Sequence, residues 1–466
     1  MNFILMTPLM KQSIRYPISG LAYLASYTSD IATCTEIFIP KNHEIDEEAF
    51  IKKLEQLKPD FVGINIFSMT FSGARHTIDL IKNYDKNIIV VLGGPHPSGE
   101  PEGTLRDLEK ADFSFQGEAE IGLRKFIEIF KESRDNLSNP SLLSTIPGLC
   151  FRSGDAIVMN TPEFVADIDT LPLPDYNLMK PDDFFSATGS GYQKAKRIGY
   201  ITSSRGCARR CAFCSGHTVS GKKVRLRDPQ KVVDEIKLLI NDYQIQEIQF
   251  TDSDMAFSKK HLYALCEAII ENNIKIYWSC AACSDSLEEE LIKLMKKSGC
   301  YMVRLGIETA SQKILKLIHK KVNLDKLKDN IKVMRKCGIR THGFFIIGFP
   351  TEELEDIKMT LDYSYQSDLD SASFAIFQPL PGSELYSCFV NNEVREKLNW
   401  DNFDFYRDSH FKYTVPFTQL KSLQRKAYIK FYLYPRRFFS LLTFLLSYSQ
   451  IKTFIKIVKR NLLGGS

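Results

Sequence analysis

Short apolar runs alternate with helix-spaced segments along the first 130 residues of the chain. The runs at 2–6, 61–66 and 88–92 are continuous, whereas 20–25 and 73–84 have helical spacing. Continuous apolar strands separated by helices indicate a parallel sheet that is covered on both faces. We therefore predict an α/β fold that begins with a doubly wound parallel sheet.

A sheet of this kind places its ligand at the carboxyl ends of its strands. In the sequence, small and polar residues follow the predicted strands: Ser68, Gly93, Gly94, His96, Gly117 and Glu118. These six are candidate binding residues. For the glycine loop the alternative is a tight turn that contacts no ligand.

A second alternating series begins near residue 200. Helical patterns such as 228–242 and 287–298 separate six strand candidates, which are 200–203, 247–250, 276–280, 302–307, 340–347 and 373–377. A complete barrel of eight β/α units typically takes about 250 residues, and this series spans about 180. We therefore predict a partial (β/α)6 barrel.

The regions around these two series differ in composition. We predict an α/β domain over 1–135, a Pro-, Ser- and Asp-rich connector over 136–195, the barrel over 196–395, and an aromatic, basic and helical region over 396–466. A hairpin is expected in the connector around 153–155, where Ser, Gly and Asp follow one another.

The C-terminal region is also distinguished by its charge. From 409 to 466 there are eleven Lys or Arg and no Asp or Glu, so the first 408 residues carry 50 basic and 56 acidic groups. Its longest uncharged stretch, 438–451, is fourteen residues, which is shorter than the roughly 20 that a spanning helix needs. With no export signal in view, we expect a cytoplasmic protein. The basic helix either packs on the barrel or lies at the inner membrane surface, and no nucleic-acid recognition motif is present.

Three cysteines follow the first barrel strand. Cys207, Cys211 and Cys214 lie within eight residues, on a loop that also carries Arg205, Arg209 and Arg210. Thiolates hold iron–sulfur clusters, and three of them leave one iron open for a ligand that is not protein. The arginines are expected to lower the pKa values of the thiols. The alternative is a zinc site with His217 as its fourth ligand.

The Cys-x3-Cys-x2-Cys spacing, with Phe213 before the last cysteine, resembles the radical S-adenosylmethionine (SAM) superfamily. The resemblance extends over the barrel, at 250–254, 299–309, 345–352 and 379–386. It implies a 4Fe-4S cluster on Cys207, Cys211 and Cys214. The cluster passes one electron to SAM, and the resulting 5′-deoxyadenosyl radical takes hydrogen from an unactivated carbon.

The N-terminal half resembles the cobalamin-binding domain of one class within that superfamily. The matching segments are 17–25, 58–64, 93–97 and 117–118, with a further match at 427–433. This class includes carbon methylases and an anaerobic porphyrin-ring cyclase. Two departures stand out: the chain has no Asp-x-His-x-x-Gly signature, and it has Cys283 where the class usually has Arg.

The resemblance also implies roles for individual residues. Phe213 is expected near the adenine of SAM, and Asp252, Asp254 and Glu308 near its amino group or ribose. The alternative for these carboxylates is helix capping. Ser68, Gly93, Gly94, His96, Gly117 and Glu118 are expected to contact cobalamin, with His96 as a turn residue or corrin-edge contact rather than a cobalt ligand.

Three functions remain open at this point. The first is cobalamin-dependent methylation of an unactivated carbon, the second an oxidative cyclase or rearranging oxidoreductase, and the third a non-catalytic iron–sulfur protein that transfers electrons or senses redox state. For the enzymes we expect a small-molecule substrate of hydrophobic character and an electron donor such as flavodoxin or ferredoxin.

Overall fold

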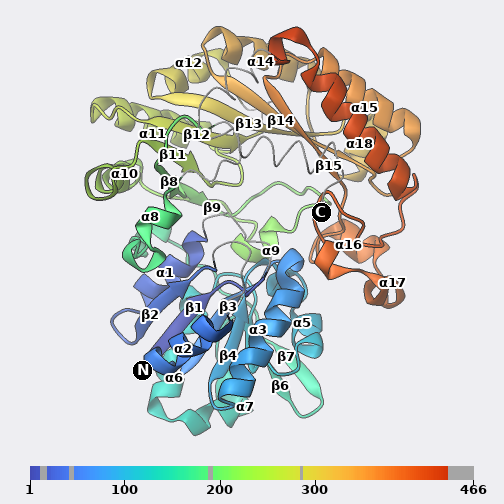
Figure 1. Cartoon of the computed structure of the whole chain (residues 1–466). Coiled ribbons are helices and arrows are strands. Elements are labelled where there is room, and N and C mark those ends of the chain that lie inside the picture. Colours follow the sequence, from blue (N-terminus) through green and yellow to red (C-terminus); the bar gives the residue numbers. More distant parts are fainter. Residues whose placement is uncertain (11–17, 41–46, 187–192, 284–286, 439–466) are drawn as a thin grey trace.

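The computed structural model describes residues 1–10, 18–40, 47–186, 193–283 and 287–438. Its strands form two large sheets, one in each of two lobes (Figure 1). The N-terminal lobe holds the first sheet, the second lobe holds the barrel, and helix α9 (Gly216–Ser220) lies where the lobes meet.

The first sheet has seven strands in the order β2-β1-β3-β4-β5-β6-β7. The strands are β1 (Asn2–Met6), β2 (Thr33–Phe38), β3 (Phe61–Asn65), β4 (Ile89–Gly93), β5 (Phe113–Phe115), β6 (Leu149–Ser153) and β7 (Ala156–Met159). The first five pair in parallel, whereas β5–β6 and β6–β7 are antiparallel. The parallel part is the doubly wound sheet that the sequence predicts.

Side chains of alternate residues in this sheet enter two different cores. In β1, Phe3 and Leu5 pack in one core and Ile4 and Met6 in the other, because successive side chains of a strand point to opposite faces. Both faces are therefore buried. The helices of this lobe and of the chain that follows it are α1 (Ser19–Tyr27), α2 (Glu47–Leu57), α3 (Phe71–Tyr84), α4 (Pro95–Gly99), α5 (Pro101–Asp107), α6 (Glu120–Glu132), α7 (Pro140–Leu143) and α8 (Pro181–Phe184).

Two parts of this lobe differ from the sequence prediction. Strands β2 and β5 were not predicted, because β2 is half polar and lies at the edge of the sheet, and β5 has only three residues. The predicted hairpin is present as β6–β7, but it pairs with β5 and so extends the first sheet. The sheet therefore continues to Met159, past the predicted boundary at 135.

The second sheet has six parallel strands in chain order, which confirms the partial barrel. Its strands are β8 (Ile198–Ile201), β11 (Glu247–Phe250), β12 (Tyr277–Ala282), β13 (Cys300–Glu308), β14 (Arg340–Ile347) and β15 (Ser371–Ile376). A small ribbon of β9 (Ser204–Arg205) and β10 (Arg225–Leu226) follows β8. The helices are α10 (Pro229–Tyr243), α11 (Lys259–Glu271), α12 (Glu289–Lys297), α13 (Gln312–Leu317), α14 (Leu324–Lys336), α15 (Leu354–Gln366), α16 (Glu384–Phe389), α17 (Asn392–Lys397) and α18 (Phe417–Tyr432).

The barrel strands bury one face against the surrounding helices. Ile248, Cys280, Val303 and Phe345, one from each of four neighbouring strands, belong to the core that these helices cover. Within each strand, the residues directly before and after these four point the other way, toward the inside of the barrel. The barrel therefore has an apolar outer face and a distinct inner face.

Helix α18 packs on the barrel beside α15 (Figure 1). The hydroxyl groups of Tyr428 and Tyr432 accept hydrogen bonds from the backbone N–H groups of Phe374 and Ala372 in β15. Of the two sequence alternatives for the tail, these contacts favour packing on the barrel. The rest of the predicted basic helix, from residue 439 on, lies outside the described residues.

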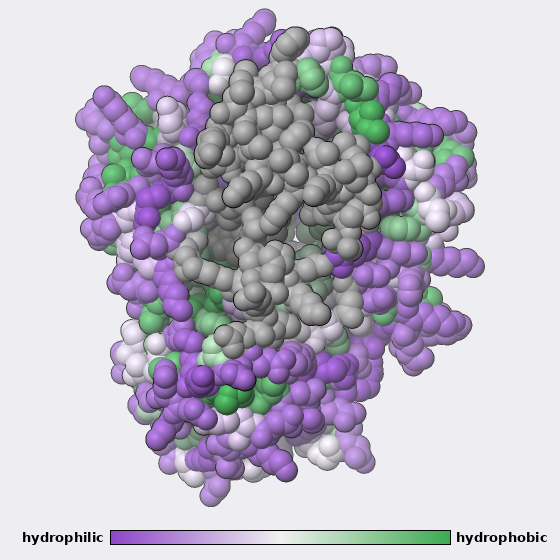
Figure 2. All heavy atoms as spheres, in the orientation of Figure 1, coloured by the Kyte–Doolittle hydropathy of each residue, from purple (hydrophilic) through white to green (hydrophobic). Residues whose placement is uncertain are grey.

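Among the described residues, no helix combines the length and apolar character that crossing a membrane requires. On the face shown in Figure 2 the described surface is mostly hydrophilic, and apolar side chains gather only in scattered groups. Contact with a membrane surface stays a prediction.

Candidate active site

A cavity lies between the two sheets. It is lined by the carboxyl ends of β3 and β4, by the start of α1, and by the loop after β8, and it has an empty volume of about 1170 Å³, part of it open to solvent. Gly93, Gly94, Gly117 and Glu118 line it. Four of the six residues predicted at the strand ends are thus brought together at one cavity.

The two neighbouring glycines have different surroundings. A Cβ atom at Gly93 would meet no atom within 4 Å, so the cavity extends to the backbone there. A Cβ at Gly94 would lie 2.7 Å from Nδ2 of Asn65, and Gly94 has φ +98°, a conformation that favours glycine. Asn65 also lines the cavity, and its Oδ1 is buried without a hydrogen-bond partner. An open backbone and a free acceptor suit a large ligand with amide side chains, and cobalamin fits that description.

Ser68 and His96 lie together but do not line this cavity. The Ser68 hydroxyl is 2.9 Å from Nδ1 of His96. The His96 ring is buried between Phe71 and Trp400, with centroid separations of 4.7 and 5.1 Å. Burial lowers the pKa of His96 to about 3. His96 is therefore a neutral residue that joins the first lobe to the C-terminal region, and its contact with cobalamin stays a prediction.

Glu118 makes an ion pair between the lobes. Its two carboxylate oxygens each accept a 2.7 Å hydrogen bond from Arg225, and both side chains are almost completely buried. Glu120 accepts a 2.6 Å bond from Arg205, two residues before Cys207. Arg205 also lies over the ring of Tyr23, 4.8 Å from its centroid. These charges connect the cavity wall to the cysteine loop.

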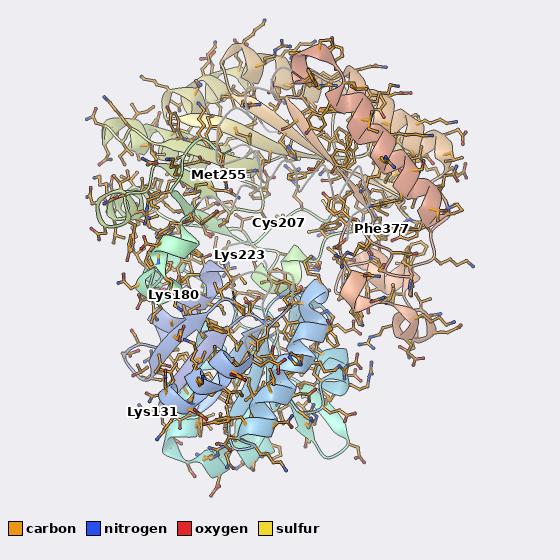
Figure 3. The ribbon with its side chains drawn as sticks, viewed as in Figure 1. Lys131, Lys180, Cys207, Lys223, Met255 and Phe377 are labelled. Atoms are coloured by element: carbon orange, nitrogen blue, oxygen red, sulfur yellow. The ribbon has the colours of Figure 1, made fainter. Side chains whose placement is uncertain are left out.

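Cys207, Cys211 and Cys214 lie on the loop between β9 and α9, and Figure 3 labels Cys207 between the two lobes. The loop is fixed by its backbone: Cys207 N–H donates to Gly221 O at 3.1 Å and Ala212 N–H to Ile318 O at 3.0 Å. Among the described residues, no set of three donor side chains is already closed around a metal position. The donor set itself, three thiols on one loop, is the one that a 4Fe-4S cluster with an open iron requires.

The charges around the thiols differ from those expected. Arg205 is paired with Glu120, and Arg209 donates to Asp254 at 2.9 Å. Burial raises the pKa of the Cys211 thiol, and the cation that opposes this shift is Lys320. For Cys211 the expectation that the arginines lower the thiol pKa was therefore wrong, because the cation that acts on it is Lys320, and Arg205 and Arg209 are engaged by carboxylates.

Asp252 and Asp254 are engaged within the chain. Asp252 is buried and accepts hydrogen bonds from Ser203 N–H at 3.0 Å and from the hydroxyls of Ser203 and Ser204 at 2.7 and 2.5 Å. Asp254 accepts from Arg209 and from Cys283 N–H at 3.0 Å. Both carboxylates thus hold the start of the cysteine loop, and neither caps a helix. Their contact with SAM stays a prediction.

Glu308 ends β13 and pairs with Lys320 at 2.7 Å, and both side chains are almost fully buried. Burial alone would lower the pKa of Lys320, but Glu308 raises it and the net shift is upward. The thiols of Cys211 and Cys283 raise the same pKa, so Lys320 lies near Cys211 of the cysteine loop. Lys320 was not identified from the sequence, because no motif surrounds it.

Phe213 packs edge-on against Phe349, with ring centroids 5.8 Å apart. The contact holds the cysteine loop against the turn after β14. The contact of Phe213 with the adenine of SAM stays a prediction.

The sequence profile of the radical SAM superfamily matches residues 201–364, and that of the B12 binding domain matches 15–127. An uncharacterized methyltransferase of Pyrococcus horikoshii is 32% identical over 425 residues, which cover 90% of this chain and 88% of the relative. Cytidylyl-2-hydroxyethylphosphonate methyltransferase of Streptomyces wedmorensis is 29% identical, covering 73% and 68%. Anaerobic magnesium-protoporphyrin IX monomethyl ester cyclase of Rubrivivax gelatinosus is 26% identical, covering 84% and 68%.

Solved structures share the fold. The radical SAM methyltransferase TsrM from Kitasatospora setae, solved with cobalamin and a [4Fe-4S] cluster, has a TM-score of 0.70 at 17% identity and covers 91% of this chain and 90% of its own. The cobalamin-dependent radical enzyme OxsB has a TM-score of 0.64 at 20% identity, covering 85% of this chain and 56% of its own. These findings confirm the predicted resemblance and favour the iron–sulfur cluster over zinc. The chain belongs to the family of radical SAM enzymes that carry an N-terminal B12 binding domain.

Proposed function

We propose that this protein is a cobalamin-dependent radical SAM methyltransferase that acts on an unactivated carbon of a small molecule. The observation that carries the proposal is the cavity between the lobes, which reaches from the open backbone at Gly93 to Arg205 and Gly206 beside Cys207. A methyl carrier in this cavity would lie next to the loop that generates the radical. When bound, the cluster supplies the electron that cleaves SAM, and cobalamin carries the methyl group.

The residues of the chain orient these groups and shield them from water. Cys207, Cys211 and Cys214 would hold the cluster, with Phe213 beside the adenine of SAM. Asp252 and Asp254 hold the cysteine loop in place by accepting hydrogen bonds from Ser203 and Arg209. Gly93, Gly94 and Gly117 would give cobalamin a surface without side chains. We further expect a one-electron donor of low potential, such as flavodoxin or ferredoxin.

The test is anaerobic incubation of the reconstituted protein with SAM and dithionite, followed by counting nucleoside products per chain. Methyl transfer predicts both 5′-deoxyadenosine and S-adenosylhomocysteine. An oxidative cyclase, the activity named for one relative, predicts only 5′-deoxyadenosine. A non-catalytic iron–sulfur protein predicts neither product.

The cluster ligands are tested by three single substitutions, Cys207→Ala, Cys211→Ala and Cys214→Ala. Each should abolish 5′-deoxyadenosine formation and lower the iron content, because two thiolates do not hold the cluster. The exposed Cys388 provides the control, and Cys388→Ala should retain both iron and cleavage. Full cleavage by any of the three site variants would refute the assignment.

A further inference from the structure

The inner face of the barrel carries a band of polar side chains halfway along its strands. Gln249 of β11, Ser279 of β12, Arg304 of β13 and His342 of β14 belong to this band. Arg304 pairs in register with His342, and His342 pairs with Ser371 of β15. Arg304 and His342 are half-buried rather than sealed in a core.

Arg304 is the cation of this band, and the side chains to which it donates hydrogen bonds are neutral. Its Nη1 donates to the Ser279 hydroxyl at 3.3 Å and its Nη2 to Oε1 of Gln249 at 3.2 Å. Within the part of the chain that the structure describes, it forms no ion pair. A guanidinium has five N–H donors in a planar fork that matches an oxyanion. Arg304 therefore retains donors for a ligand.

Among the described residues, none of the neighbouring titratable groups forms an ion pair with Arg304, although the charge of Arg304 acts to lower the pKa of the nearby Glu247 carboxyl. Both ring nitrogens of His342 lie within 3.0 Å of the Ser371 and Ser373 hydroxyls. Burial, and secondly Arg304, lower the pKa of His342 to about 3, so this ring is neutral. The carboxylate of Glu247 is already engaged by the N–H groups of Lys194 and Ala195 and by another side chain of the barrel.

Arg304 lies deeper in the barrel than the cysteine loop. It precedes Glu308 by four residues of β13, or roughly 13 Å at the usual rise of a strand, and Glu308 pairs with the Lys320 that lies near Cys211 of the cysteine loop. Between the two levels the inner face is apolar: Gly306 and Phe344 face each other in register, Phe344 is 38% exposed and Gly306 is partly exposed. A molecule that reached from the cysteine loop to Arg304 would contact apolar residues along its length and the Arg304 guanidinium at its inner end.

We propose that Arg304 is a substrate-recognition residue that binds an oxyanion of the substrate, a carboxylate or a phosphoryl group, inside the barrel. The substrate is then an amphipathic anion, whose apolar part lies along Phe344 near the radical and whose charged end lies at Arg304. This rests on the proposed function, because it takes the barrel interior as the substrate site.

Isothermal titration calorimetry of the full chain at low ionic strength tests the proposal with two probes, inorganic phosphate and acetate, and with neutral acetamide as the blank. Binding needs no turnover, so a failure here is separate from a failure of SAM cleavage. The wild type should bind at least one anion, and the preferred probe distinguishes a phosphoryl from a carboxylate substrate. Arg304→Met should weaken that binding about tenfold or more, and Arg304→Lys should fall between the two.

The control is Arg335→Met on α14. This substitution removes one positive charge from an exposed ion pair with Asp368 and should leave anion binding unchanged. If Arg304→Met does not fold by circular dichroism, phenylglyoxal labelling of Arg304 in the wild type replaces it, and the preferred anion should slow that labelling. The proposal is overturned if neither anion binds, if Arg304→Met binds as tightly as wild type, if the anion leaves labelling unchanged, or if saturating SAM displaces the probe.

Discussion

Gly93 and Gly94 adjoin in the sequence but meet different structural needs. Gly93 faces open space in the cavity, whereas Gly94 has a left-handed backbone and lies against Asn65. One glycine leaves room for a ligand, and the other allows the turn itself. The tight turn that the sequence offered as an alternative is therefore present at Gly94, and the cobalamin surface stays a prediction.

Gly93→Leu should fold normally and lose cobalamin. A Cβ atom at Gly93 would meet no atom within 4 Å and Gly93 lines the cavity, so the free energy of unfolding should change by less than about 0.5 kcal/mol. Cobalt per chain after reconstitution should fall severalfold. Retention of wild-type cobalt would show that the cavity at Gly93 is not the cobalamin surface.

Gly94→Ala should have the opposite profile. Its φ of +98° and its close approach to Asn65 should cost about 1–3 kcal/mol of stability. Urea unfolding monitored by circular dichroism measures this cost. An alanine variant as stable as wild type would mean that the turn relaxes easily and that strain does not explain the glycine.

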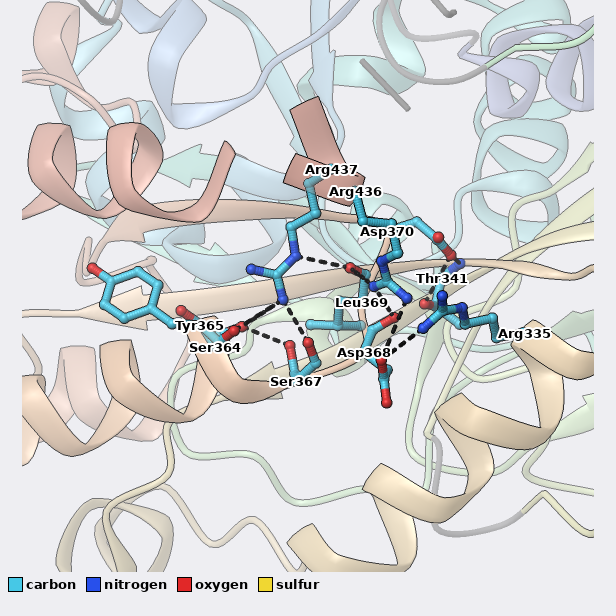
Figure 4. Close-up of polar contacts among 10 residues, drawn as sticks. All are labelled: Arg335, Thr341, Ser364, Tyr365, Ser367, Asp368, Leu369, Asp370, Arg436 and Arg437. Carbon is cyan, nitrogen blue, oxygen red and sulfur yellow. Dashed lines mark hydrogen bonds and ion pairs between the residues drawn. The ribbon is translucent and has the colours of Figure 1, made fainter. Parts of the chain in front are cut away.

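At the scale of elements, single buried residues fix the connections around the barrel. Arg437 follows α18, and its guanidinium donates to the backbone carbonyls of Ser364, Tyr365 and Leu369 at the C-terminal end of α15 (Figure 4). A cation at this position satisfies carbonyls that the helix leaves free. Arg437 thus attaches the start of the basic tail to the barrel.

Arg437→Met should destabilise the protein by about 1–3 kcal/mol, the cost of leaving buried polar groups without partners. Arg425→Met, at an exposed position of the same α18, should change stability by less than about 0.5 kcal/mol. Thermal unfolding compares the two variants. Equal melting temperatures would contradict a structural role for Arg437.

Glu352, in the turn after β14, should make stability depend on pH. Its carboxylate accepts a 3.0 Å hydrogen bond from Phe349 N–H, and burial raises its pKa to about 8. Because the folded pKa exceeds the ordinary value of 4.5, the folded state binds the proton more tightly. The contribution of Glu352 to the free energy of unfolding is then greatest below pH 4.5. It decreases from there up to about pH 8, by at most about 1.4 kcal/mol per pH unit.

Glu352→Gln should remove this contribution, because the amide does not titrate. Urea unfolding of both proteins at several pH values between 5 and 8 measures the difference. The variant should gain stability relative to wild type as the pH rises. Parallel profiles over this range would refute the raised pKa.

At the scale of the whole molecule, buried charges join the two lobes. Glu118 and Arg225 are 107 residues apart in sequence, yet they form a two-point ion pair in which both side chains are almost completely buried. Arg225 lies on the strand paired with β9, which leads directly into the cysteine loop. The cavity and the loop are therefore positioned by one rigid connection.

Glu118→Gln should cost about 3–5 kcal/mol, because it leaves the buried Arg225 without its counter-charge. Glu128→Gln, which breaks an exposed pair with Arg124 on α6, should cost less than about 1 kcal/mol. Chemical denaturation of the full chain compares them. Equal costs would show that the lobes do not depend on the buried pair.

The sequence predicted the elements with strong local patterns, namely β1, β3 and β4 of the first sheet and all six barrel strands. It did not predict β2, whose residues are half polar, or β5, which has only three residues. It identified the cysteines, since their spacing is local, but not the pairing of Arg225 with Glu118 or of Lys320 with Glu308. Those contacts depend on the folded arrangement of distant segments.

The central claim is that the cavity between the lobes holds cobalamin beside the cysteine loop, and cobalt content tests it most directly. The full chain is purified without oxygen, incubated with hydroxocobalamin, freed of unbound ligand, and analysed for cobalt. The account predicts about one cobalt per chain, as for a tightly held cofactor. No retained cobalt would contradict it and would leave a radical enzyme whose first lobe has another task.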